Sequence, residues 1–168
     1  MQNRQRTKSH KQPTTYSAFD TAIYYLTFRD RSRKELCDKL TEKGYEEAEI
    51  TETIEKLMSY GYINDERYAT SYIRSQMRGK GRRRITMELS GKGVDSEMTR
   101  ELCTELVPDE AETIYDLLER RYGNLNFTDE GQMRRMYSFF ARRGFRYEDI
   151  RRAVSEYRKV FVFFLQIA

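Results

Sequence analysis

The feature of this sequence that most constrains its fold is an 18-residue segment that occurs three times. The copies are LTEKGYEEAEITETIEKL from Leu40, LSGKGVDSEMTRELCTEL from Leu89 and FARRGFRYEDIRRAVSEY from Phe140. Each begins with an apolar residue, two further residues, Lys or Arg, glycine and another apolar residue, and the glycines lie 49 and 51 residues apart. A period near 50 residues indicates a supersecondary unit repeated in tandem.

The repeated segment has the pattern of a helix that ends at a glycine and is followed by a second helix. Glycine adopts the left-handed conformation that often ends helices, and a cation beside the last carbonyl groups interacts favourably with the helix dipole. One helical turn upstream, an apolar residue lies on the same face in each copy: Leu36, Ile85 and Met136. Downstream, the apolar positions align if the second copy is one residue shorter after its glycine: Ile50, Ile54 and Leu57, then Met98, Leu102 and Leu106, then Ile150, Val154 and Tyr157.

A further amphipathic segment precedes each pair of helices, at 18–28, 65–77 and 111–122. Each unit should therefore contain three helices, which gives nine in all, and the alternation typical of strands is nearly absent. Helix-start signals agree with this division: Ser17 with Asp20, Ser32 with Glu35, Asn64, Asp109, and Thr128 before Asp129. We predict an all-α protein whose three tandem three-helix repeats form an elongated, curved modular rod.

The two prolines mark boundaries, because neither Pro13 nor Pro108 falls inside an expected helix. We expect a basic disordered tail at 1–16, repeats at 17–62, 63–107 and 108–159, and an apolar C-terminal tail at 160–168. The VFVFFL of that tail could extend the packed face of the last helix, dock on a partner or promote aggregation. The sequence does not choose among these.

Charge is segregated along the chain although the net charge is only +4. From Arg74 to Lys92 there are seven basic residues and one acid, whereas from Asp95 to Asp116 there are eight acids and one basic residue. Hydrophobic residues make up 38% of the chain and charged residues 35%, so the core of each unit should be thin. Any function that depends on charge must therefore come from local blocks.

The sequence lacks the residues that several classes of function require. The sequence does not contain a phosphate-binding P-loop. Gly91-Lys92 is followed by Gly93 where the motif needs Ser or Thr, and Thr86 stands where the motif needs its first glycine. The single histidine, His10, supports no catalytic triad or zinc site, and the two cysteines are expected to be small buried residues rather than a disulfide. We expect no catalytic residue, no metal and no cofactor. The absence of a signal peptide or a membrane-length apolar segment favours a cytoplasmic protein that does not bind membranes.

The stretch RGKGRRRITMELSGKG at 78–93 is the strongest candidate binding site. Three consecutive arginines at the first turn of a helix oppose the helix dipole, so local stability does not explain them, whereas guanidinium groups can fork onto phosphates or carboxylates. A solvated surface, with Arg84 paired to Glu88 at i,i+4, is the alternative. The candidate partner- and DNA-binding residues are Arg74, Arg78, Lys80, Arg82, Arg83, Arg84, Lys92, Lys43, Arg142 and Arg143.

Two other groups of residues carry open interpretations. Lys43, Lys92 and Arg143, each beside a repeat glycine, could line one face of the rod or merely bind carbonyl groups. Tyrosines near the basic stretch could stack on bases, but their helical spacing favours core positions with a solvated hydroxyl. These are Tyr60, Tyr62, Tyr68 and Tyr72.

The segments RDRSRKELCDKLTEKGY, GYINDERYATSYIRSQMRGKGRRRITMELSGKGV and ARRGFRYEDIRRAV resemble the RecX family, bacterial regulators of the RecA recombinase. The resemblance covers residues 17 to 158 in order. It implies tandem three-helix units and a non-enzymatic protein that binds RecA filaments on DNA and restrains their growth and activities. The N-terminal tail and the terminal KVFVFFLQIA are not part of the motif, so nothing carries over to them.

We therefore expect a monomeric regulator that binds the RecA nucleoprotein filament and inhibits its recombinase, ATPase and coprotease activities in DNA repair and the SOS response. Basic patches would contact single- or double-stranded DNA weakly, and acidic blocks would face basic filament surface. A nucleic-acid-binding helical repeat that acts without RecA is the second hypothesis, and a peptide-binding helical scaffold is the third.

Overall fold

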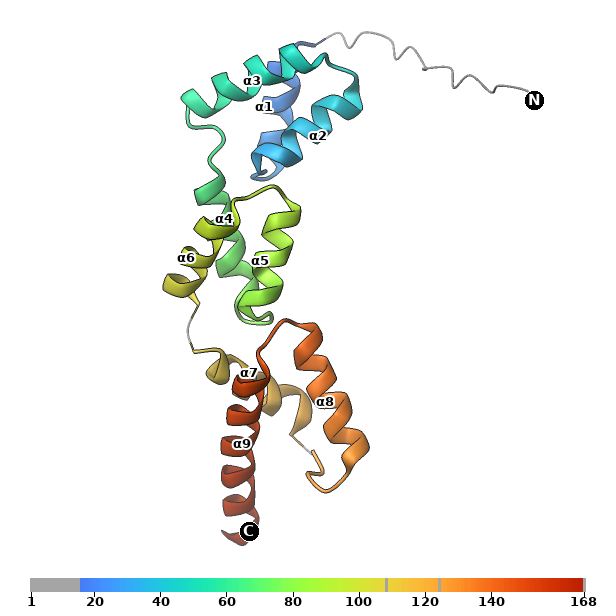
Figure 1. Ribbon diagram of the computed structural model, residues 1–168, viewed down its shortest axis with the longest axis vertical. Coiled ribbons are helices and arrows are strands. Elements are labelled where there is room, and N and C mark those ends of the chain that lie inside the picture. The colour runs from blue at the N-terminus through green and yellow to red at the C-terminus, as the bar shows by residue number, and fades with distance from the viewer. Residues whose placement is uncertain (1–15, 108, 124, 168) are drawn as a thin grey trace, which may run out of the picture. The chain divides into compact units, whose positions relative to one another are not determined.

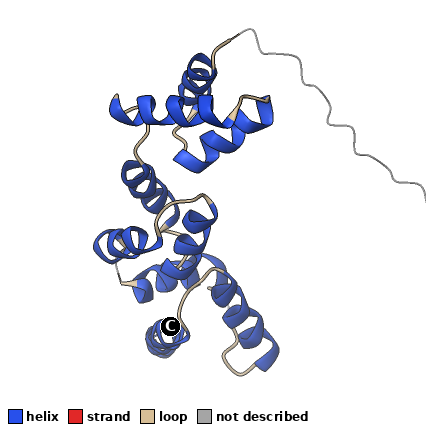
Figure 2. Ribbon diagram, turned by 45° about the horizontal axis from the view of Figure 1, so that its top comes forward, coloured by secondary structure: helices blue, strands red, loops and turns tan. Residues whose placement is uncertain are grey.

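A computed structural model describes residues 16–107, 109–123 and 125–167, with side chains described as far as residue 160. The basic tail expected at 1–16 thus lies almost entirely outside the described residues. Within those ranges every regular element is a helix (Figures 1 and 2). The helices are α1 (Ala18–Phe28), α2 (Arg33–Lys43), α3 (Glu47–Ser59), α4 (Asp65–Gln76), α5 (Arg82–Gly91), α6 (Ser96–Leu106), α7 (Glu110–Tyr122), α8 (Glu130–Arg142) and α9 (Tyr147–Ile167).

The predicted all-α class and its division into three-helix units are confirmed. The chain separates into two compact units, the first ending at Asp65 and the second beginning at Glu66. The first unit holds α1 to α3, and the second holds the repeats built from α4 to α6 and from α7 to α9. The curved rod concerns the arrangement of these units, and it stays a prediction.

Glycine ends the middle helix of each repeat as the sequence pattern predicts. Gly44, Gly93 and Gly144 have φ values of 92°, 78° and 87°, which lie in the left-handed region. The apolar pairs that precede them, one turn apart, are fully buried in all three repeats: Leu36 with Leu40, Ile85 with Leu89, and Met136 with Phe140. The repeat therefore specifies both the end of the helix and the face that it buries.

The alignment predicted after the glycines is wrong in the second repeat. The third helix of every repeat begins three residues after the glycine, at Glu47, Ser96 and Tyr147, so the second copy is not shorter. Thr99 and Cys103, 0% and 2% exposed, occupy the core positions that Ile50 and Ile54 hold in the first repeat. The Thr99 hydroxyl can be buried because it donates a hydrogen bond to the Asp95 carbonyl at 2.7 Å.

Each repeat has its own small apolar core. In the first, α1, α2 and α3 enclose Leu36, Leu40, Ile54 and Leu57. The third repeat has the most aromatic core, in which Phe140 packs against Phe139 and Phe145 with ring centroids 5.1 and 5.8 Å apart. Three thin cores agree with the low apolar content of the chain.

The C-terminal segment and the two cysteines can now be placed. Residues 160 to 167 continue α9 rather than forming a separate tail. Cys103 is buried, Cys37 is partly buried, and both thiols are free. Burial raises the pKa of both thiols, which makes them less reactive at neutral pH. Among the described residues, no helix is both long and apolar enough to cross a membrane.

We predict that Ser32→Ala lowers the stability of the first unit by about 1 kcal/mol, because it removes the capping box of α2. The fully buried Ser32 hydroxyl accepts from the Glu35 amide at 3.2 Å, and the Glu35 carboxylate accepts from the Ser32 amide. Ser59→Ala, which removes an exposed hydroxyl at the end of α3, is the matched control. Equal urea midpoints for both variants would contradict the prediction.

Candidate functional site

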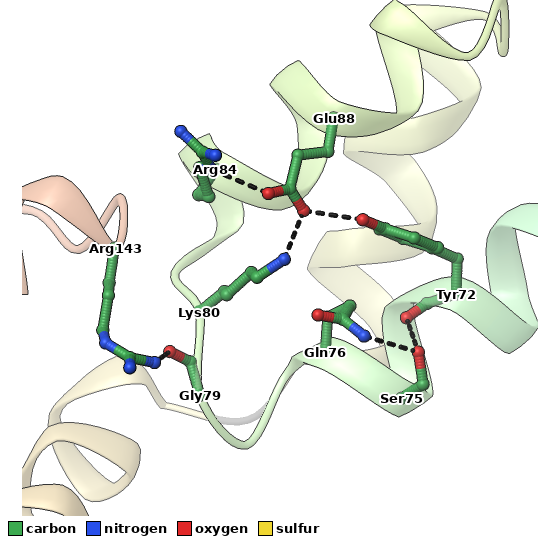
Figure 3. Close-up of polar contacts among 8 residues, drawn as sticks. All are labelled: Tyr72, Ser75, Gln76, Gly79, Lys80, Arg84, Glu88 and Arg143. Atoms are coloured by element: carbon green, nitrogen blue, oxygen red, sulfur yellow. Dashed lines mark hydrogen bonds and ion pairs between the residues drawn. The ribbon is translucent and has the colours of Figure 1, made fainter.

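The basic candidate stretch lies where the second repeat meets the third. It comprises the end of α4, the loop at 77–81 and the first turn of α5. The Gly81 amide donates to the Arg143 carbonyl at 2.9 Å. The Arg143 guanidinium donates to the Gly79 carbonyl at 2.7 Å (Figure 3). We call the region where the α4–α5 loop and the start of α5 contact the α8–α9 turn and the start of α7 the joint.

The joint requires two glycines because the backbones approach closely. A Cβ on Gly81 would lie 2.5 Å from the carbonyl carbon of Gly144, and a Cβ on Gly144 would clash with the backbone nitrogen of Arg84. Contacts this short essentially never occur for real Cβ atoms. Gly144 thus has two functions: it ends α8 and it admits the backbone of α5.

Arg82 is held at the joint by both its backbone and its side chain. Its amide donates to the Glu110 carboxylate at 2.6 Å, and its guanidinium donates to the Val107 carbonyl at 2.8 Å. Glu110 comes from the first turn of α7 and is 6% exposed, so α5 receives at its N-terminus the acid that its own first turn lacks. Burial raises the pKa of Glu110, while the hydrogen bond from Arg82 acts in the opposite direction.

Lys80 and Arg84 both bind Glu88, and the predicted i,i+4 pair is confirmed. The Glu88 carboxylate accepts from Lys80 Nζ, Arg84 Nε and the Tyr72 hydroxyl, each at 2.7 Å (Figure 3). Burial alone would raise the pKa of Glu88, but these hydrogen bonds outweigh it and lower the pKa to about 2. The pKa of Tyr72 is raised, mainly by burial and secondly by the hydrogen bond to Glu88. The cluster ties the loop to α4 and α5.

Three arginines in or just before the stretch are available to solvent. Arg74, Arg78 and Arg83 are exposed, on α4, in the loop and on α5. The contacts of Lys80, Arg82 and Arg84 explain part of the basic run by folding. If the stretch binds a partner, Arg74, Arg78 and Arg83 can reach it freely, whereas Arg84 is exposed but paired with Glu88.

The other candidate cations lie on different elements and have different contacts. Lys43 is exposed at the end of α2, in the first unit. Lys92 Nζ lies over Tyr68 and Tyr72, 6.0 and 5.7 Å from their ring centroids. Arg143 binds a carbonyl, as one interpretation expected, although that carbonyl belongs to Gly79 of another repeat. Arg142 is exposed at the end of α8.

The four tyrosines divide into two pairs. Tyr68 is 7% exposed and Tyr72 binds Glu88, as expected for residues of the core with a polar tip. Tyr60 and Tyr62 are 60% and 52% exposed, so the core interpretation is wrong for them. They follow α3, where the helical spacing on which that interpretation relied has ended.

Sequence reasoning missed Glu110 as a residue of the joint. Its contact with Arg82 spans 28 residues and two repeats, which no local pattern reveals. The available signal was the acidic block that follows the basic stretch. At least part of that block satisfies cations within the chain: Asp109 also binds Arg152, at 2.5 Å.

Three family models match the chain in order. They describe the first, second and third three-helix domains of RecX, and they match residues 18–57, 64–101 and 108–154. Each range covers most of one observed three-helix repeat.

Similar proteins carry the same description. The chain is 34% identical to "Regulatory protein RecX" of Vibrio vulnificus over 145 residues, which cover 86% of this chain and 95% of that protein. It is 34% identical to the protein of that name from Clostridium perfringens (strain SM101 / Type A) over 122 residues, covering 70% of this chain and 58% of the longer relative. The crystal structure of RecX from Lactobacillus salivarius has a TM-score of 0.72 at 30% identity, covering 84% of this chain and 94% of that one.

The fold and the joint define a tandem three-helix-repeat protein whose second and third repeats are fixed to each other by a glycine contact. The family matches extend over nearly all of the described repeats. The chain belongs to the RecX family of regulatory proteins.

We predict that Gly144→Ala destabilises the second unit by about 2–4 kcal/mol, the sum of left-handed strain and a backbone clash. Gly61→Ala is the control, since Gly61 has φ 71° but nothing within 4 Å of an added Cβ; we expect about 1 kcal/mol. Chemical denaturation followed by circular dichroism measures both. Equal losses would show that the joint is not tightly packed.

The Glu88 cluster predicts a specific dependence of stability on pH. Since the folded-state pKa is depressed to about 2, the stabilisation is complete above the ordinary glutamate value of 4.5 and is lost as pH falls from there toward 2. It amounts to at most about 3.5 kcal/mol, at roughly 1.4 kcal/mol per pKa unit. Glu88→Gln should be less stable than the wild type at pH 7 and should lose less stability over this window.

Glu101→Gln removes an exposed carboxylate of α6 and serves as the control. Urea midpoints of the three proteins at several pH values between 7 and the acid limit of folding give the comparison. Parallel profiles for Glu88→Gln and the wild type would contradict the assigned cluster.

Proposed function

We propose that this protein binds RecA filaments on DNA and inhibits their recombinase, ATPase and coprotease activities. The observation that carries the proposal is the match of all three RecX domains, in order, to the three repeats. The family's members are named regulatory proteins, which supports a role in control rather than catalysis.

The mechanism we propose is steric and competitive. A chain of repeats that lies along the filament would favour a filament state unable to extend or exchange strands. The joint supports this because it fixes the second and third repeats to each other through backbone contacts, so both can contact the filament as one body. A ligand shifts an equilibrium by its differential affinity for the two states, and a pre-arranged surface loses less entropy on binding.

Exposed arginines at the joint are the best candidates for contact with the filament. Arg74, Arg78 and Arg83 keep their guanidinium groups in solvent, whereas Arg82 and Arg84 are engaged within the fold. Charge reversal of the engaged residues would disturb folding and binding together. Reversal of the exposed three separates the two effects.

We predict that the variant R74E/R78E/R83E inhibits RecA's DNA-dependent ATPase more weakly. The concentration needed for half-maximal inhibition should rise at least tenfold. Each charge-assisted hydrogen bond contributes about 1.5–3 kcal/mol, so losing even one satisfies the prediction. The control R33E/R100E/R151E changes the same charge at exposed arginines elsewhere. Thermal unfolding of both variants verifies that they fold.

Each other outcome has a definite meaning. Inhibition that is unchanged in R74E/R78E/R83E removes these residues from the interface. Wild-type protein that leaves RecA turnover and filament length unaltered would contradict the proposed function. Tight DNA binding without any effect on RecA would select a nucleic-acid-binding repeat that acts alone.

A further inference from the structure

A second basic surface lies on the third repeat, away from the stretch that the sequence singles out. The end of α7 and one face of α8 border a hollow of about 780 Å³. Its lining residues are Arg120, Arg121, Tyr122, Arg134, Arg135, Ser138, Phe139 and Arg142. We call it the arginine groove. Five of the eight lining residues are arginines and none is acidic.

Folding accounts for some of these arginines but not for all. Arg120 and Arg121 lie in the last turn of α7, and Arg142 in the last turn of α8, where cations interact favourably with the helix dipole. Arg134 and Arg135 lie inside α8, where the dipole gives no such benefit. Bringing five guanidinium groups to one hollow costs electrostatic free energy that a bound anion would offset.

The groove arginines have few partners within the part of the chain that the structure describes. Arg120 approaches Asp116 at 3.9 Å, with both side chains more than 60% exposed, so this pair is weak. No ion pair among the described residues involves Arg134, Arg135 or Arg142, and all three are exposed. Arg135 also interacts electrostatically with Asp129, at the start of α8. The guanidinium groups of Arg134 and Arg142 can therefore bind a ligand without breaking an existing pair.

Two aromatic residues of the lining connect the two helices that border the groove. The rings of Tyr122 and Phe139 meet edge to face at 5.9 Å, which joins the end of α7 to α8. Arg121 and Arg143 lie 4.8 and 4.5 Å from the centroid of Phe139. Because these cations already occupy the Phe139 ring, we do not expect it to stack on a base. The groove offers charge rather than base recognition.

The spacing of two arginines, with a serine between them, fits a row of phosphates. Arg134, Ser138 and Arg142 follow at i, i+4 and i+8, so they share a face that is about 12 Å long at 1.5 Å per residue. A nucleic-acid strand presents a phosphate about every 3.4 Å along the helix axis of a duplex. Guanidinium forks bind phosphate oxygens bidentately. A protein partner would need several carboxylates in a row to match the same length.

We propose that the arginine groove of α7 and α8 binds the phosphodiester backbone of a nucleic acid, independently of base sequence. The inference deepens the DNA part of the proposed function, and it rests on that function only for the presence of DNA. Arg143 connects this groove to the joint, because its guanidinium lies over the groove residue Phe139 and donates to the Gly79 carbonyl.

Binding to DNA in the absence of RecA tests the proposal. Fluorescence anisotropy of a labelled oligothymidylate and of a labelled duplex would be measured at several salt concentrations with full-length protein. We expect R134Q/R135Q/R142Q to bind at least tenfold more weakly than the wild type at low salt. For the single strand, the slope of log affinity against log salt should become shallower by about 2, at roughly 0.7 per lost phosphate contact.

Two matched variants make the test specific. R33Q/R100Q/R151Q removes the same charge from exposed positions outside the groove and should change affinity less than threefold. R134K/R135K/R142K retains the charge but not the guanidinium fork, and should fall between the wild type and the glutamine variant. Circular dichroism and thermal unfolding confirm that each variant is folded.

The outcomes separate this proposal from the proposed function. Undetectable DNA binding by the wild type, unchanged affinity in the glutamine variant, or an equal loss in the control would overturn the groove assignment. If the glutamine variant keeps its DNA affinity but no longer inhibits RecA, the groove binds an acidic protein surface and the proposal is wrong. A loss on either DNA, with RecA inhibition measured separately, supports the proposal whatever the result with RecA.

Discussion

The close approach of Gly81 and Gly144 is the contact on which the second unit depends. A helix-ending glycine is required in every repeat for its left-handed conformation, but at Gly144 the same residue also admits the backbone of α5. The contacts of Arg143 with Gly79 and of Arg82 with Glu110 follow from that approach. The glycine that ends a helix in every repeat is thus, in the third repeat, also part of the joint between two repeats.

The joint changes the meaning of the basic stretch. From the sequence, three arginines at the start of a helix oppose the dipole and therefore favour a functional explanation. In the structure, Glu110 from α7 caps that helix from outside, and Arg82 and Arg84 have partners of their own. The conflict is solved within the fold for these two residues. It leaves Arg83, with Arg74 and Arg78, as the part of the stretch that a partner can reach.

Charge in this chain serves two purposes that the sequence does not separate. The acidic block supplies Asp109 and Glu110 to pairs and caps inside the second unit, so it is partly a structural counterpart of the basic residues. Among the described residues, the arginine pairs at 120–121 and 134–135 have only weak or exposed acidic neighbours, Asp116 and Asp129, and they meet in one hollow. A surplus of cations on the third repeat is a stronger indication of an anionic ligand than the denser run in the second repeat, because less of it is used in folding.

The sequence by itself determined the nine helices of the described chain, the glycines that end three of them, and the buried pairs from Leu36 to Phe140. These features depend on local chemistry: helical periodicity, caps and the freedom of glycine to adopt positive φ. It indicated that Cys103 is buried, but not that Thr99 and Cys103 take the core positions that Ile50 and Ile54 hold in the first repeat, because Thr99 can be buried only through the hydrogen bond of its hydroxyl. It also did not indicate that Glu110 would cap α5, or that arginines from α7 and α8 would share one groove. Those contacts join residues far apart in the chain, and only the packing of whole helices decides which of them meet.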